Sequence, residues 1–220
     1  MVLTERILEQ HNNLLSSIQH PSSNQLKAGA ILTYTTLFLG NAIALVYTPF
    51  MLRSLGQGEF GLYSLANSVV GYLTVLDFGF GSATIRYTAK YKTEGNQEKT
   101  EKIYGMFIVL YLCIGIIVLA AGISFFFFAE QIFEKGLSVQ EIVTLRPLLL
   151  LSGINLAVSF PFGVFTSIIT AYERFVFLKL AALVRLIINP LAYVPVLLFG
   201  YKSLGLIAVA TLLNFLFLTL

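Results

Sequence analysis

The strongest constraint on the fold is a series of continuous apolar runs, each about as long as a bilayer is thick. A hydrocarbon core about 30 Å thick can be crossed only by helices of roughly 20 apolar residues or by a closed barrel. The runs do not alternate between apolar and polar residues, so they predict helices. With 57% hydrophobic and only 11% charged residues, the chain has too little polar surface for a water-soluble globule.

The apolar runs predict six transmembrane spans in one domain, residues 27–220. In chain order the spans cover residues 28–52, 60–85, 103–128, 147–170, 175–199 and 204–220. The expected fold class is therefore an all-α integral membrane bundle of six helices. The last run covers only about 25 Å and stops in apolar sequence with no flanking charge or turn, so we expect a chain truncated at its C-terminus.

A polar leader, residues 1–26, precedes the first span and lacks the apolar core of a cleavable signal sequence. Its apolar residues Leu3, Ile7, Leu14 and Ile18 recur at helical spacing. This pattern is compatible with a short amphipathic helix, either on the membrane surface or against a partner protein. The sequence does not separate these two alternatives.

The distribution of basic residues predicts the orientation in the membrane. The connection after the second span carries Arg86, Lys90, Lys92, Lys99 and Lys102. The connection after the first span carries only Arg53. Because cytoplasmic loops are enriched in Lys and Arg, we expect a multi-pass protein with a cytoplasmic N-terminus. The basic residues form no stripe, so nucleic acid is not an expected partner.

The chain lacks the motifs of the common catalytic sites. It has no GxxxxGK[ST] loop and no histidine pair at zinc spacing, and its single cysteine, Cys113, excludes a multi-cysteine metal site. Gly56, Gly58 and Gly61 match GxGxxG formally, but they join two apolar spans and therefore indicate a turn between helices. The connections are too short to build a soluble catalytic site. We expect no enzyme activity, no metal and no cofactor.

Besides Lys179 near the start of the fifth span, two charged residues lie inside predicted spans, where a charge costs at least a few kcal/mol. Asp77 is the only acidic one. It would act as a switch linked to H⁺ or Na⁺, or as a lock between conformations; alternatively it forms an ion pair or a helix cap where Gly79 and Gly81 loosen the helix end. Arg185 would bind a diphosphate in a central cavity, or its side chain would reach back to the cytoplasmic interface.

Small and weakly polar residues share one face of the second span: Ser64, Ser68, Gly71 and Ser82, with Asn67 and Thr74 at its margins. Such faces most often serve close helix packing. The same face is also suited to line a hydrated path for sugars. Asn41 and Asn155, in other spans, are further candidates for that role.

Three stretches carry a resemblance to a known family. The first is LKAGAILTYTTLFLGNAIALVYTPFMLRSLG with the following GQGEFGLYSLANSV, the second is LTVLDFGFGSATIRYTAKY, and the third is ITAYERFVFLKLAALVRLIINP. Together they resemble the Wzx-type flippases, the polysaccharide-export branch of the multidrug, oligosaccharidyl-lipid and polysaccharide exporter superfamily. The second stretch, residues 73–91, carries most of the specificity.

This resemblance implies one lobe of a two-lobe transporter in the cytoplasmic (inner) membrane of a bacterium or archaeon. The implied substrate is an undecaprenyl-diphosphate-linked oligosaccharide, used to build polysaccharides such as lipopolysaccharide. Asp77 and Arg86 match the second stretch, and Arg174 and Arg185 match the basic start of the fifth span. These residues, with Asn41, Asn67 and Asn155, are the substrate-binding candidates. Besides membrane lipid, the implied partners are the missing second lobe or another chain, and a glycan polymerase and glycosyltransferases.

Two other functions fit the same sequence. One is a cation-coupled multidrug exporter of the same superfamily, in which Asp77 helps to bind the ion or the drug. A single carboxylate is thin support for that function. The other is a membrane subunit that scaffolds a polysaccharide assembly complex without transporting anything.

Overall fold

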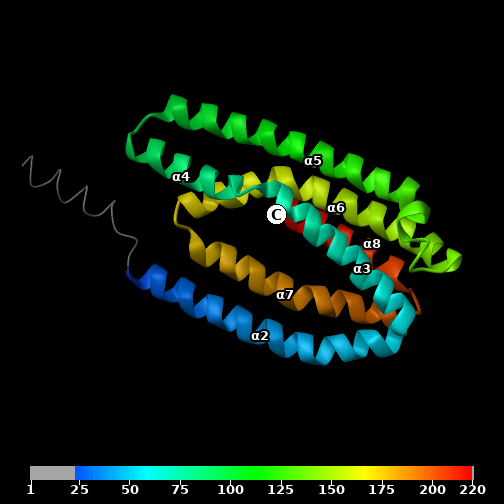
Figure 1. Ribbon diagram of the computed structural model, residues 1–220. Coiled ribbons are helices and arrows are strands. Elements are labelled where there is room, and N and C mark those ends of the chain that lie inside the picture. The colour runs from blue at the N-terminus through cyan, green and yellow to red at the C-terminus, as the bar shows by residue number, and fades with distance from the viewer. Residues whose placement is uncertain (1–22, 220) are drawn as a thin grey trace, which may run out of the picture.

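The structure is a computed structural model that describes residues 23–219, and within this range it contains helices and no strands (Figure 1). The elements are α2 (Ser23–Leu55), α3 (Gln57–Thr74), the 3-10 helix η1 (Val75–Asp77), α4 (Phe80–Thr93), α5 (Gln97–Phe133), α6 (Val139–Ala171), α7 (Phe175–Leu198) and α8 (Ser203–Thr219). The predicted amphipathic helix of the leader lies mostly outside the described residues. The all-α class is confirmed.

Five segments of the described chain are long and apolar enough to cross a membrane: α2, the combined segment from α3 to α4, α5, α6 and α7. The helix α8 is apolar but shorter, with 17 residues. In Figure 1 the helices run lengthwise, α2 lies along α7, and α5 lies along α6. The turns between consecutive helices gather at the two ends of the molecule. The chain is therefore a multi-pass membrane bundle, as the apolar runs predicted.

The second predicted span, residues 60–85, is not one straight helix. The helix α3 ends at Thr74, one 3-10 turn follows, and α4 starts at Phe80. Between them Phe78 and Gly79 adopt left-handed backbone angles, with φ of 46° and 78°. Glycine takes this conformation readily, whereas an aromatic residue does so only when its surroundings hold it there. Hydropathy alone does not detect the break, because the residues on both sides of it are apolar.

Two helices extend well beyond the apolar runs that predicted them. The helix α5 has 37 residues and α6 has 33, against the expected ranges 103–128 and 147–170. Polar caps set their first turns: the Asn96 side chain accepts the Lys99 N–H at 3.0 Å, and Ser138 and Glu141 form a capping box at the start of α6. Apolar runs mark only the part of a helix that lies in hydrocarbon, so these polar turns were missed.

The α5–α6 interface is the most extensive between two helices, and small residues bring the backbones together there. A Cβ atom placed on Gly115 would lie 2.6 Å from the carbonyl oxygen of Ala157. One placed on Gly122 would lie 3.2 Å from the Cα of Gly153. Close backbone approach through small residues is a main source of helix association in membranes. We call these four residues the glycine seam.

At the end of the bundle where α2 turns into α3, the Glu59 carboxylate links the start of α3 to the turn between α7 and α8. Ser203, the first residue of α8, donates both its backbone N–H and its hydroxyl to the Glu59 carboxylate. The Lys202 ammonium lies 3.4 Å from the same carboxylate. Glu59 therefore caps α8 from a position on α3, and its side chain is only 17% exposed, against 72% for Lys202.

We expect Glu59→Ala to lower the stability of the folded protein by about 1–2 kcal/mol, because Ser203 loses the acceptor for two hydrogen bonds. Lys202→Ala removes only an exposed ion pair and is expected to cost less than about 1 kcal/mol. Thermal unfolding of the two purified variants in detergent measures the difference. Equal losses for both would show that Glu59 acts only through the ion pair.

Candidate functional site

The small polar face of α3 points away from the rest of the bundle. Leu62 and Ala66 are buried on the side that packs against α6. At 3.6 residues per turn, Ser68 and Gly71 lie on the opposite side of the helix, and both are exposed. The Ser68 hydroxyl donates to the Ser64 carbonyl at 2.9 Å, so it is satisfied by its own helix. Helix packing, the commoner use of such a face, is not seen within residues 23–219.

Exposed polar residues also lie on α4, past the helix break. Ser82 and Arg86 are exposed there, on the side opposite the fully buried Thr84 and Thr88. Asn67 is exposed at the margin of the α3 part, and its amide donates to the Tyr63 carbonyl at 3.0 Å. We call the exposed residues Asn67, Ser68, Gly71, Ser82 and Arg86 the polar face. It runs through a segment that is apolar enough to span a membrane.

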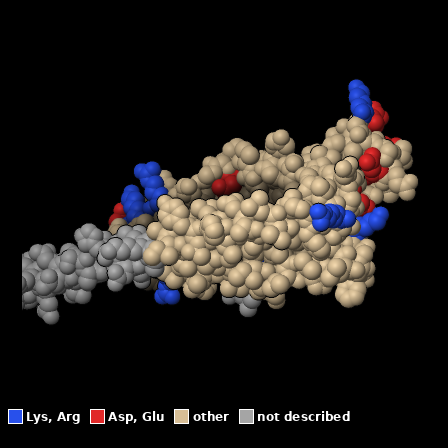
Figure 2. All heavy atoms as spheres, turned by 90° about the horizontal axis from the view of Figure 1, so that it is seen from below, with Lys and Arg blue, Asp and Glu red and all other residues tan. Residues whose placement is uncertain are grey.

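Charged side chains gather mainly toward the two ends of the surface in Figure 2. The acidic residue at the break between α3 and α4 is Asp77. Its carboxylate accepts a hydrogen bond from the Tyr111 hydroxyl of α5 at 2.5 Å. Within the described chain Asp77 forms no ion pair, and neither end of α4 carries a side-chain cap from it. The ion-pair and helix-cap interpretations of Asp77 are therefore replaced by a bond to Tyr111.

The Asp77 carboxylate lies where three helices come close together. A Cβ atom on Gly81 would lie 3.5 Å from both the Tyr111 hydroxyl and the Ser167 hydroxyl, and 3.9 Å from an Asp77 oxygen. Tyr111 and Ser167 are both buried. The start of α4 thus packs closely on α5 and α6 beside the carboxylate. A shift of α4 relative to α5 would therefore change the distance between the Asp77 carboxylate and the Tyr111 hydroxyl.

A second polar cluster joins α6, α7 and α8. The Arg185 guanidinium donates to the Asn214 side-chain oxygen at 2.5 Å. The Asn214 amide in turn donates to Asn155 and to the Ser159 hydroxyl, both at 2.7 Å, and Asn155 donates to Thr211 at 3.3 Å. Asn214 is 4% exposed. Interhelical hydrogen bonds of this kind hold membrane helices in register.

This cluster changes the interpretation of two predicted residues. Asn155 is hydrogen-bonded to Thr211 and Asn214 of α8, and its place along a path for sugars stays a prediction. The Arg185 guanidinium donates to Asn214 and lies 5.6 Å from the centroid of the Phe217 ring, and its binding of a diphosphate stays a prediction. The sequence reasoning missed Asn214, although an isolated asparagine in the last apolar run was a signal for a buried hydrogen bond.

The remaining candidates lie elsewhere. Asn41 is exposed on α2, between the exposed Phe38 and Leu45, on the side of α2 away from the α7 contacts of Gly40. Arg174 is exposed at the N-cap of α7. The structure therefore places Asn67, Asp77 and Arg86 along one segment and joins Arg185 to Asn155 through Asn214. It leaves Asn41 and Arg174 apart from both groups. Among residues 23–219 no three His, Cys, Asp or Glu side chains are arranged to hold a metal ion.

A family model described as "Polysaccharide biosynthesis protein" matches residues 26–219, nearly the whole described chain. The chain belongs to this family. The resemblance noted in the sequence is thereby confirmed at the level of the family, and this multi-pass membrane protein takes part in polysaccharide biosynthesis or export. No curated protein and no solved structure matches the chain significantly.

Proposed function

We propose that this family member moves an undecaprenyl-diphosphate-linked oligosaccharide across the cytoplasmic membrane for polysaccharide biosynthesis, including lipopolysaccharide. The observation that carries the proposal is the polar face of α3 and α4, which points away from the bundle within a membrane-spanning segment. Exposed amide and hydroxyl groups gain nothing from lipid tails. They are suited to hydrogen-bond sugars and water along a path, while the lipid tail of the substrate stays in hydrocarbon.

The charges at the ends of the polar face suit the two parts of such a substrate. Arg86 lies at the end that the positive-inside rule assigns to the cytoplasm, where a guanidinium can bind a diphosphate through two parallel hydrogen bonds. Ser68, Ser82 and Asn67 follow toward the middle of the segment as hydrogen-bonding groups for sugars. In this proposal the chain is a transporter and not an enzyme.

Asp77 is proposed to couple transport to an ion, H⁺ or Na⁺. It sits at the break between α3 and α4, where the left-handed Phe78 and Gly79 allow the two arms to change their angle. A change of charge at the carboxylate would alter the Tyr111 bond, and that bond spans the junction of α4 with α5. The same residue also fits the cation-coupled drug exporter, which a transport assay separates from a flippase.

The path needs a second wall, because no described helix covers the polar face. We propose that a second lobe or another chain supplies it, as in two-lobe transporters. A glycan polymerase and glycosyltransferases are further proposed partners, since they would consume and supply the lipid-linked sugar. The scaffold alternative predicts binding of these enzymes without any transport.

Cysteine labelling tests the hydrated path. Cys113 is the only cysteine, so a Cys113→Ser background is free of thiols. In that background we expect Ser68→Cys to react with a membrane-impermeant maleimide in native membranes at least about tenfold faster than Ile117→Cys. Ile117 of α5 is the matched control, since it is 56% exposed but lies on an apolar helix that we expect to face lipid. Similar rates at the two positions would contradict the path.

Transport itself is tested with the reconstituted full-length protein and a fluorescently labelled lipid-diphosphate sugar. The expected result is movement of the label across the vesicle membrane that Arg86→Gln slows by about tenfold. A drug substrate tested in the same vesicles separates the exporter alternative. No movement of the labelled lipid, under conditions where a known flippase moves it, would overturn the proposal.

A further inference from the structure

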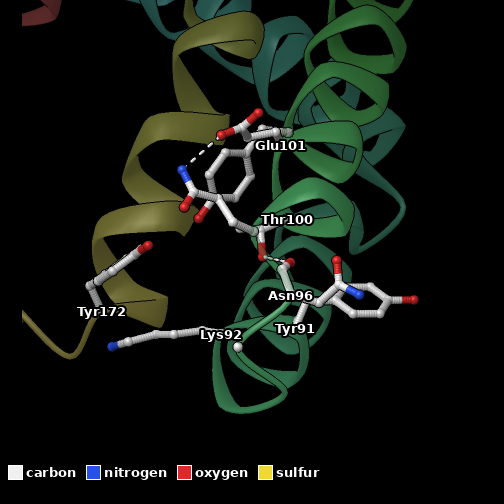
Figure 3. A pocket seen from close by; sticks show the side chains of 9 residues that line it. Tyr91, Lys92, Asn96, Thr100, Glu101 and Tyr172 are labelled. Atoms are coloured by element: carbon white, nitrogen blue, oxygen red, sulfur yellow. Dashed lines mark hydrogen bonds between the residues drawn. The ribbon is translucent and has the colours of Figure 1, made fainter.

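A pocket of about 420 Å³ lies at the end of the molecule where α4 turns into α5 (Figure 3). Its walls include Tyr91, Lys92, Asn96, Tyr104 and Tyr172. Tyr91 and Lys92 belong to the last turn of α4, Asn96 precedes α5, Tyr104 lies on α5, and Tyr172 follows α6. The pocket is separate from the polar face and lies at the predicted cytoplasmic surface of the membrane.

The pocket contains one cation and one anion that are not paired with each other. Lys92 and Glu101 both line it, and neither forms a salt bridge with another described residue. Figure 3 shows them at opposite ends of the pocket, Lys92 beside Tyr172 and Glu101 hydrogen-bonded to Gln97. By contrast, the neighbouring Lys90 and Lys102 are each paired with a glutamate four residues away in the chain.

Hydroxyl groups gather in and behind the wall of the pocket. The Tyr104 hydroxyl is buried and lies close to the hydroxyls of Thr88 and Tyr172, although its hydrogen-bond geometry to them is not ideal. The Thr88 hydroxyl is likewise fully buried without a well-formed bond. Because buried hydroxyls gain from a well-aligned partner, an acceptor that enters the pocket would improve the hydrogen bonding of Tyr104.

The aromatic residues indicate the depth of the pocket in the membrane. The Lys92 ammonium lies 4.3 Å from the centroid of the Tyr172 ring, and Tyr91 stacks on Tyr87 with ring centroids 6.5 Å apart. Tyrosine and lysine together are typical of the headgroup level of a bilayer. Phospholipid headgroups are therefore the most abundant ligands at this position.

We infer that this pocket binds the phosphoethanolamine headgroup of a phospholipid. Its phosphate is placed at the Lys92 ammonium and the Tyr104 hydroxyl, and its ammonium at the Glu101 carboxylate. An anionic headgroup without an amine would be repelled by the Glu101 carboxylate and would have no ammonium to bind it. The inference does not depend on the transport function, because none of these residues belongs to the polar face.

Native mass spectrometry of the full-length protein tests this inference. The protein is equilibrated with equal amounts of phosphatidylethanolamine, phosphatidylglycerol and phosphatidic acid of the same acyl chains. We expect phosphatidylethanolamine to be retained about tenfold better than the other two. Equal retention of the three lipids, or a preference for either anionic lipid, would overturn the inference.

Variants locate the binding to the pocket. Lys92→Gln is expected to lower retention of phosphatidylethanolamine about tenfold, and Glu101→Gln is expected to abolish its advantage over phosphatidylglycerol. Lys135→Gln and Glu134→Gln, at the opposite end of the bundle, are matched controls that should change nothing. Tyr104→Phe removes the hydroxyl without changing charge and should weaken retention severalfold, which keeps the test informative if a charge variant does not fold. Unchanged retention in Lys92→Gln or Tyr104→Phe would overturn the site.

Soluble glycerophosphoethanolamine distinguishes the headgroup from the bulk of the lipid. We expect it to compete with the bound phospholipid at millimolar concentration in the wild type. Competition that is equally strong in Glu101→Gln would show that the amine is not recognised.

Discussion

A leucine in place of Gly115 is expected to destabilise the folded bundle by about 3 kcal/mol or more. A single Cβ atom at this position would already lie 2.6 Å from the carbonyl oxygen of Ala157, which is backbone and has no rotamer by which to move away. The helices α5 and α6 would therefore have to separate along their whole interface. For a chain of this size that loss corresponds to a fall of about 10 °C in melting temperature. Fluorescence-detected size-exclusion chromatography after heating measures it in detergent.

The matched control is Gly105→Leu on the same helix. A Cβ atom on Gly105 would meet nothing within 4 Å, and the residue is exposed. This change should leave stability unchanged or raise it slightly, because leucine favours helix more than glycine does. If Gly115→Leu melted at the same temperature as Gly105→Leu, the glycine seam would not hold the two helices together.

The glycine seam illustrates which parts of the fold can be predicted from the sequence and which cannot. Each apolar run was long enough to identify a membrane helix, because hydrocarbon imposes a minimum length on every span. The contact of Gly115 with Ala157 could not be predicted from the sequence, because it depends on how the two helices are rotated relative to each other. The left-handed backbone of Phe78 could not be predicted either, because it contradicts the residue's own conformational preference.

For the candidate site, too, the sequence predicts local features but not contacts between distant residues. Helical periodicity placed Ser64, Ser68, Gly71 and Ser82 on one face, which the structure shows turned away from α6. Periodicity gives the face of a helix but not what lies opposite it, so the sequence favoured helix packing and left a hydrated path as the alternative. The roles of Arg185 and Asn155 depend on Asn214, which is 29 and 59 residues away in the chain. No local pattern reports such contacts.

Asp77→Asn is expected to reduce export of the lipid-linked sugar at least about tenfold without unfolding the protein. Asparagine has the same shape as aspartate and keeps an oxygen that can accept the Tyr111 hydrogen bond, so the junction of α4 with α5 should survive. What the variant loses is the ability to change charge at the helix break. Vesicle transport of a labelled lipid-diphosphate sugar measures the rate, and a melting curve checks that the fold is intact.

Two companion variants separate charge from structure at this position. Tyr111→Phe keeps the buried ring but removes the donor, so it should slow export less than Asp77→Asn, because the carboxylate remains in place. Glu134→Gln, an exposed change of the same kind beyond the end of α5, should leave export unchanged. Transport at the wild-type rate by Asp77→Asn, together with loss of transport and stability in Tyr111→Phe, would show that the hydrogen bond is structural. That result would contradict the coupling role of Asp77. Loss of transport in Asp77→Asn alone would instead show that transport needs the negative charge, because aspartate and asparagine differ mainly in charge.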